Sequence, residues 1–367
     1  FGMQMVLILV TGHALATSPP VHGGIERLAG VPRTGPGAAA FIAVVAMVAA
    51  LLNWGFGLIV GALLAREVAW SLEARGERVH YPLLGAAGYM GLLVWHGGLS
   101  GSAPLKVAEA GVPLTTTLAS PMNLVTNGVL LLVIPLFLHR LHPRDPSACM
   151  AVGTVAAPRS GRDANAGGGD RPTFAGGLEG SPWLVGALVL LGAAGLAAAV
   201  VAGRLTLERL ALNDVIFVFL FLGLALHGSL RSYLNQVWEG ARASAGIILL
   251  FPFYAGITGI MQSSGLVEVV SNAFARIADD VTYPLLTFLS AGVVNLFVPS
   301  GGGQWAVQGP IATQAAQEIG VPLSKTVMAV SYGDEWTNML QPFWALALLG
   351  ITGLKAVSYT HLTLPTS

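Results

Sequence analysis

The stretch Asn295-Leu-Phe-Val-Pro-Ser-Gly-Gly-Gly-Gln-Trp305 interrupts an apolar run, residues 281–317, that contains no Asp, Glu, Lys or Arg. The run is longer than the roughly 20 residues that a helix needs to cross a bilayer core. Pro299 and the three consecutive glycines cannot continue a helix, so the run must break there. Irregular backbone persists at membrane depth only where protein or a wet cavity satisfies its polar groups. The stretch therefore predicts a re-entrant helical hairpin whose tip is formed by residues 295–305.

Charge is scarce along the rest of the chain as well. Of 367 residues, 18 are Lys or Arg and 18 are Asp or Glu, 10% in all, and mean hydropathy is +0.70. A soluble domain carries about 25% charged residues, so a soluble enzyme is excluded and an all-α polytopic membrane protein is predicted. Zero net charge also gives no basic footprint for nucleic acid. Further uncharged windows lie at 38–65, 82–105, 110–139, 180–203 and 243–267.

The first of these windows is also interrupted, at Asn53-Trp-Gly-Phe-Gly57. Arginines flank the window on both sides: Arg27 and Arg33 before it, and Arg66, Arg75 and Arg78 after it. Arginine in short loops favours the cytoplasmic side, so both flanks are expected inside. A run with both flanks on one side is not a single crossing, and we expect a second re-entrant hairpin with its tip at Asn53–Gly57. One kinked transmembrane helix is the alternative.

A hydrophilic segment divides the chain into two membrane halves. Residues 139–181 hold five arginines among Gly, Pro, Asp and Asn, which is typical of a flexible linker and places it in the cytoplasm. The first half is expected at residues 1–138 and the second at 182–357. The chain starts within an apolar run, so it is expected to begin inside a helix, and residues 358–367 are expected to be a non-native tail.

The two halves follow the same order of breaks. Asn53 is followed by Tyr89 and then by the broken segment 95–104; Asn295 is followed by Tyr332 and then by the broken segment 334–342. Three apolar runs separate the cytoplasmic linker from the second hairpin. If each run crosses the membrane, the second hairpin enters from the outer side, whereas the first enters from the cytoplasmic side. Interrupted segments in corresponding positions of inverted repeats are typical of secondary transporters, with the binding site at the repeat interface.

Four strings carry a resemblance to a known family. They are Asn53-Trp-Gly-Phe-Gly-Leu-Ile-Val-Gly-Ala62, Phe251-Pro-Phe-Tyr-Ala-Gly-Ile257, Val298-Pro-Ser-Gly-Gly-Gly-Gln-Trp-Ala-Val-Gln-Gly-Pro310 and Gln341-Pro-Phe-Trp-Ala345. Together they resemble the short-chain fatty acid transporter family, within the ion transporter superfamily, from Phe1 to about Lys355. The resemblance implies a multi-pass bacterial inner-membrane carrier that takes up short monocarboxylates such as acetoacetate or butyrate. It also implies truncation at both ends, since family members have a preceding membrane segment and a final apolar one.

A short carboxylate needs converging N–H donors and a modest apolar wall. Hairpin tips supply such donors, because the N-terminus of a half-helix presents unpaired N–H groups and the positive end of its dipole. For the glycines the alternative is close packing between helices. The candidate substrate-binding residues are Ser300, Gly301, Gly302, Gly303, Gln304, Asn53, Gly55, Gly57, Asn295, Trp336 and Asn338.

Ion coupling is expected at ionisable groups inside the membrane, which are costly there and functional by default. Asp334 and Glu335 are the best candidates, with interfacial helix capping as the alternative, and His96 is a candidate proton relay. Proton symport is favoured, and sodium coupling or a passive carboxylate channel is the alternative. No Gly-Lys pair exists for a Walker A loop, so ATP-driven transport by this chain is excluded and no cofactor or metal is expected. The lipid bilayer is the expected surrounding, and a homodimer is left open.

Overall fold

The computed structural model describes residues 2–155, 174–206 and 210–355. Over these residues every regular element is a helix, which confirms the all-α prediction. The expected tail at 358–367 lies outside the described residues, as does 156–173 of the expected linker.

The first predicted hairpin is formed by α3 (Gly35–Leu52) and α4 (Trp54–Ala74). The break is Asn53 alone, with extended backbone at φ −159° and ψ 127°. The two helices fold back along one another rather than forming one kinked helix; an added Cβ on Gly57, for example, would lie 2.5 Å from Ala50 Cα. Residues 54–57, expected to be part of the tip, are instead the first turn of α4. Each helix is long and apolar enough to span a membrane by itself, and the re-entrant placement stays a prediction.

The second hairpin is formed by α15 (Tyr283–Asn295) and α16 (Gly301–Ile319). Its arms are joined by hydrogen bonds from Gln304 Nε2 to Ala291 O (2.8 Å) and from Tyr283 Oη to Ala312 O (2.6 Å). The irregular tip is shorter than expected, residues 296–300, because the Ser300 side chain caps α16 and lets the three glycines enter the helix.

The broken segment of the first half follows α5 (Tyr81–Tyr89). It consists of two 3-10 turns, η1 (Met90–Leu93) and η2 (Trp95–Gly97), before α6 (Ser102–Glu109). In the second half, α17 (Leu323–Asn338) is continuous through residues 334–338, the first part of the expected broken segment 334–342. The interruption lies at 339–341, inside that expected segment, before α18 (Pro342–Thr352), since Pro342 begins a new helix.

The other helices frame the hairpins. They are α1 (Gly2–Ala16), α2 (Pro19–Ala29), α7 (Leu114–Leu118), α8 (Pro121–Leu141), α9 (Phe174–Glu179), α10 (Pro182–Val201), α11 (Leu212–His227), α12 (Leu230–Ala243), α13 (Ala245–Ser263) and α14 (Leu266–Ala275). Within the described ranges, five helices are long and apolar enough to span a membrane: α3, α4, α8, α10 and α13. A sixth span results if α1 and α2, bent by 70°, are counted as one.

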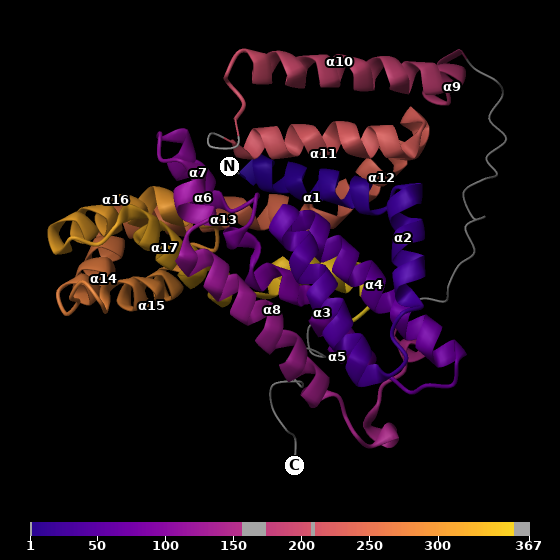
Figure 1. The fold of residues 1–367 in the computed structure, drawn as a ribbon, viewed down its shortest axis with the longest axis horizontal. Helices are drawn as coiled ribbons and strands as arrows, with labels where there is room; N and C mark the ends of the chain where they lie inside the picture. The colour runs from indigo at the N-terminus through magenta and orange to yellow at the C-terminus, as the bar shows by residue number, and fades with distance from the viewer. Residues whose placement is uncertain (1, 156–173, 207–209, 356–367) are drawn as a thin grey trace.

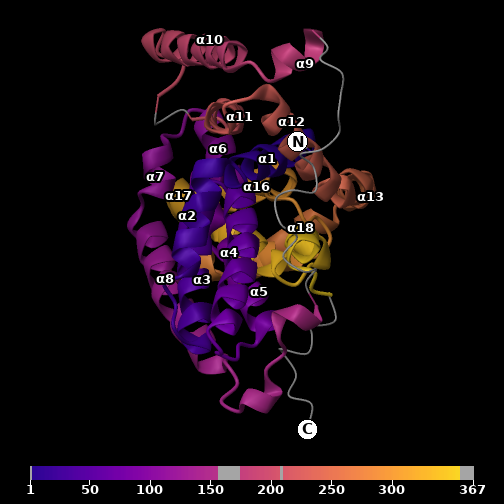
Figure 2. The same ribbon diagram turned by 90° about the vertical axis from the view of Figure 1, so that its right-hand side faces the viewer.

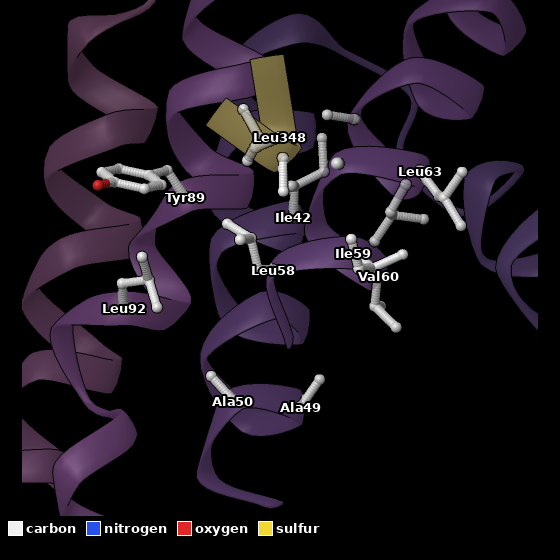
Figure 3. Close-up of a cluster of buried hydrophobic side chains, with 14 of the residues drawn as sticks. Ile42, Ala49, Ala50, Leu58, Ile59, Val60, Leu63, Tyr89, Leu92 and Leu348 are labelled. Atoms are coloured by element: carbon white, nitrogen blue, oxygen red, sulfur yellow. The ribbon is translucent and has the colours of Figure 1, made fainter. Parts of the chain in front are cut away.

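The two sequence halves interlock in space. Helices α14–α17 gather at one side and α1–α5 form the centre, while α10 and α11 lie over α1 (Figure 1). Seen from the side, α8 runs along the outside of the bundle (Figure 2). The main hydrophobic core is built from α1–α5 together with α18 of the second half; Figure 3 shows Leu348 of α18 beside Ile42 and Leu58. Helix α17 then packs against η1, η2 and α6, which brings the broken segments of both halves together.

Candidate functional site

Five polar side chains from three separate elements meet where α17 contacts η2. We call His96, Asn295, Asp334, Glu335 and Asn338 the polar cluster. None is more than 2% exposed, so the cluster is fully enclosed by protein. All five were predicted from the sequence as substrate-binding or ion-coupling residues.

His96 binds both acidic residues. Its Nε2 lies 2.6 Å from Asp334 Oδ2, and its backbone N–H donates to Glu335 Oε2 at 3.0 Å. Adjacent residues of a helix diverge by about 100°, yet the 3-10 turn around His96 lies between the two carboxyl groups and contacts each. Asp334 Oδ2 also accepts from Asn338 Nδ2 at 2.8 Å. His96 Nδ1 and Asp334 Oδ1 have no hydrogen-bond partner among the described residues.

Asn295 joins the end of α15 to the end of α17. Its Nδ2 lies within hydrogen-bond distance of Asp334 O (2.8 Å), Thr337 Oγ1 (2.8 Å) and Asn338 Oδ1 (2.9 Å). Asn338 Oδ1 also accepts from Trp344 Nε1 of α18 at 3.0 Å. The polar cluster is therefore held rigidly on the α15, α17 and α18 side.

The N-terminus of α16 faces the cluster. Gly301 lies so close to it that an added Cβ would come within 2.3 Å of His96 Cε1 and 3.3 Å of Asp334 Oδ2. Only glycine permits this approach. The positive end of the α16 dipole is thereby directed at the His96–Asp334 pair.

The rest of the α16 first turn shapes this N-terminus. Ser300 Oγ accepts from the N–H of Gly303 at 3.3 Å, and Gly302 is buried. Gln304 is directed along the hairpin toward Ala291 O and Gln308 Oε1 rather than toward the polar cluster. The predicted glycine tip therefore contacts the cluster through Gly301 itself.

The tip of the first hairpin reaches the site through aromatic rings. Asn53 is buried and its Oδ1 accepts from the N–H of Phe56 at 2.9 Å, which caps α4. The neighbouring Trp54 ring lies 6.1 Å from Trp95 and 5.2 Å from Trp344, measured between centroids. The Trp95 ring lies 3.7 Å from that of His96.

The first-tip glycines lie away from the polar cluster. An added Cβ on Gly55 would lie 2.8 Å from Ile8 O of α1, and Gly57 abuts Ala50 of α3. These contacts agree with the alternative of close helix packing.

A cavity of about 410 Å³ adjoins the polar cluster between α8 and α15. Glu335 lines it, together with Tyr332 and Trp336 of α17 and apolar side chains of the neighbouring helices: Leu93, Met122, Leu130, Leu285 and Phe288. Trp336, predicted as a substrate contact, stacks on Phe288 with ring centroids 5.6 Å apart. We call this space the α8–α15 cavity. The cavity therefore combines one carboxyl group, that of Glu335, with an apolar wall.

Asn123 of α8 holds the η2 turn in place and was not among the residues predicted from the sequence. Its Nδ2 donates to Gly97 O at 2.9 Å, and its Oδ1 accepts from Tyr332 Oη at 2.8 Å. Asn127, one turn later, donates to the same oxygen at 2.8 Å. The sequence did contain a signal for this pair: two asparagines four residues apart inside the uncharged window 110–139 lie on one face of a helix.

A family model and two curated relatives agree on one family. The family model for the short chain fatty acid transporter matches residues 1–364. An Escherichia coli (strain K12) protein, named as a candidate short-chain fatty acid transporter, is 39% identical over 96% of this chain and 80% of its own. A Haemophilus influenzae protein of the same name is 36% identical over 96% of this chain and 81% of its own. Among solved structures, the YdaH transporter of Alcanivorax borkumensis aligns with a TM-score of 0.49 at 16% identity, over 98% of this chain and 80% of that one.

Proposed function

The chain belongs to the short-chain fatty acid transporter family, and on that premise we propose that it is a secondary active carrier for short monocarboxylates such as acetoacetate or butyrate. We place it in the bacterial inner membrane and assign it no enzymatic activity. The observation that carries the proposal is the junction of the buried polar cluster with the apolar α8–α15 cavity at Glu335.

The cavity matches the two parts of a short fatty acid. Its apolar wall suits the alkyl tail, and Trp336 stacked on Phe288 provides a flat surface for it. A carboxylate entering the cavity meets Glu335, and a protonated Glu335 can donate a hydrogen bond to it. The substrate anion and one proton then occupy the site together, so the loaded carrier gains no net charge.

Proton coupling is favoured over sodium coupling by the composition of the cluster. Asp334, Glu335 and His96 are ionisable side chains, and a proton gained or lost by one of them would change the charge of an enclosed site by one. The amides of Asn295 and Asn338 provide carbonyl oxygens as well, which keeps sodium as the second candidate.

Uptake by proteoliposomes tests the proposal. We expect labelled butyrate to enter faster than in protein-free vesicles, which take up only the neutral acid by diffusion, when the lumen is more alkaline than the medium, and not when only a sodium gradient is imposed. Accumulation driven by a sodium gradient alone would show that sodium, and not the proton, is the coupling ion. Uptake no faster than in protein-free vesicles under either gradient would overturn the carrier, and faster uptake that does not depend on either gradient would favour a passive channel.

The role of Glu335 is tested in the same vesicles. Glu335→Gln keeps the size and the hydrogen-bond acceptor for the His96 N–H but carries no transferable proton. We expect it to abolish gradient-driven accumulation. Unchanged accumulation in Glu335→Gln would contradict its role as the coupling group.

A further inference from the structure

A second cavity, of about 640 Å³, lies at the end of the molecule where α8 ends and α3 begins, outside the polar cluster. Its wall comes from the start of α3, the α4–α5 connection and the segment that follows α8. The lining residues that matter here are Arg78, Arg140, Arg144, Glu77, His142 and Cys149. We call it the basic pocket.

The pocket carries an excess of positive charge. The side chains of Arg78, Arg140 and Arg144 form no hydrogen bond or ion pair with another residue of the described ranges, and Glu77 is the one acidic residue among those that line the pocket. Burial lowers the pKa of His142, whose Nε2 accepts from the His80 N–H at 3.2 Å. The charge of the pocket therefore comes from guanidinium groups.

A helix terminus adds to this positive potential. Thr34 and Gly35, at the N-terminus of the 18-residue helix α3, line the same pocket. Thr34 Oγ1 caps the helix by accepting from the Gly37 N–H, and the positive end of the α3 dipole is directed toward the cavity. Arginine forks together with a helix N-terminus suit a phosphate group.

An apolar strip on α8 leads into the pocket. Leu132, Val133, Leu136 and Phe137 are 63%, 49%, 50% and 55% exposed, and their i, i+4 spacing puts them on one side of the helix. Leu136 also lines the pocket. Helix α8 is long and apolar enough to span a membrane. In that placement the strip would face acyl chains, and Arg140 and Arg144 would lie at the headgroup level.

We propose that the basic pocket binds the phosphate of an anionic phospholipid headgroup, with the acyl chains lying along the exposed α8 strip. The strip is the feature that selects a lipid over free phosphate, since a soluble anion makes no use of it. The site is separate from the transport site and does not depend on the proposed substrate.

The chain's single cysteine provides a reporter for occupancy. Cys149 lines the pocket, so a headgroup seated there shields its thiol. The full chain is placed in phosphatidylcholine nanodiscs with or without phosphatidylglycerol, and the rate of alkylation by N-ethylmaleimide is measured. Arg140→Gln/Arg144→Gln removes two phosphate ligands, while Arg78 is kept because its charge acts directly on the Cys149 thiol. Arg27→Gln, an exposed arginine of α2 outside the pocket, is the matched control.

We expect phosphatidylglycerol to slow alkylation of the wild type and of Arg27→Gln by roughly fivefold or more, and to leave the rate of Arg140→Gln/Arg144→Gln unchanged. Slowing of all three proteins alike would reflect the charge of the membrane surface and overturn the site. Equal protection by inorganic phosphate in pure phosphatidylcholine would show a soluble-anion pocket and overturn the lipid. If the double variant fails to fold, native mass spectrometry of the wild type decides, because selective retention of phosphatidylglycerol over phosphatidylcholine is required.

Discussion

His96 Nε2 lies 2.6 Å from Asp334 Oδ2, although 238 positions separate the two residues in the chain. The contact joins the 3-10 turn of the first half to α17 of the second half, inside an enclosure with almost no exposed surface. Any movement of the second hairpin and α17 relative to η2 must break or reshape it. The protonation of this pair is therefore in a position to favour one arrangement of the two broken segments over another.

Replacing Asp334 by Asn tests that relationship. The amide keeps the shape of the side chain but removes the negative charge that faces His96 and the α16 N-terminus. We expect gradient-driven uptake of butyrate to fall at least roughly tenfold, because an ionisable group held inside the membrane region is functional by default. The exposed Glu318 of α16 gives a matched control, and Glu318→Gln should transport normally. Wild-type uptake in Asp334→Asn would remove this residue from the coupling site.

Gly301→Ala should disturb the site without changing any charge. The added methyl group would lie 2.3 Å from His96 Cε1, so the imidazole or the α16 N-terminus must shift. Overpacking of this kind costs about 1–3 kcal/mol, and we expect a lower Tm in detergent together with reduced uptake. Gly256→Ala is the control, because no heavy atom lies within 4 Å of its added Cβ. Equal behaviour of the two variants would contradict close contact between the hairpin tip and His96.

Asn123 supports the η2 turn, and its replacement should lower the stability of the fold. Asn123→Ala leaves Gly97 O and Tyr332 Oη without this partner inside the protein. An unsatisfied buried polar group costs about 1–3 kcal/mol, so thermal unfolding should occur at a distinctly lower temperature. Tyr332→Phe removes the hydroxyl that bonds Asn123 but leaves the Asn123–Gly97 bond in place, and should cost less. A larger loss in Tyr332→Phe than in Asn123→Ala would contradict this order.

The sequence was most informative where particular residue types restrict the conformation of the backbone. Pro299 and the glycines after it predicted the second hairpin, and Asn53 with the glycines after it marked the first, because such residues disfavour extension of the helix that precedes them. The extent of each tip was overestimated. Ser300 and Asn53 cap the helices that follow them, so residues 54–57 and 301–304 belong to the first turns of α4 and α16. Capping depends on side-chain geometry that composition does not reveal.

The contacts between residues of the site could not be predicted in the same way. Scarcity of charge pointed to Asp334 and Glu335, but the contact of His96 with both depends on how η2 packs against α17. The glycines illustrate the limit: Gly301 contacts His96, whereas Gly55 contacts α1, although both follow a helix break. Which helix a glycine approaches depends on the three-dimensional packing. Because the two local sequences are similar, both glycines were predicted to bind substrate.

The length of the α8–α15 cavity should set the length of the preferred fatty acid. Leu130 of α8 lines the cavity, while Leu124 on the same helix is 61% exposed and does not. Leu130→Trp fills part of the space beside the apolar wall but leaves Glu335 in place. We expect uptake of butyrate to fall roughly tenfold or more relative to acetate, since one or two methylene groups in a pocket are worth about 1–3 kcal/mol each. The measurement is competition between labelled acetate and labelled butyrate in one proteoliposome preparation. Leu124→Trp should keep the wild-type ratio, and an unchanged ratio in Leu130→Trp would place the alkyl tail elsewhere.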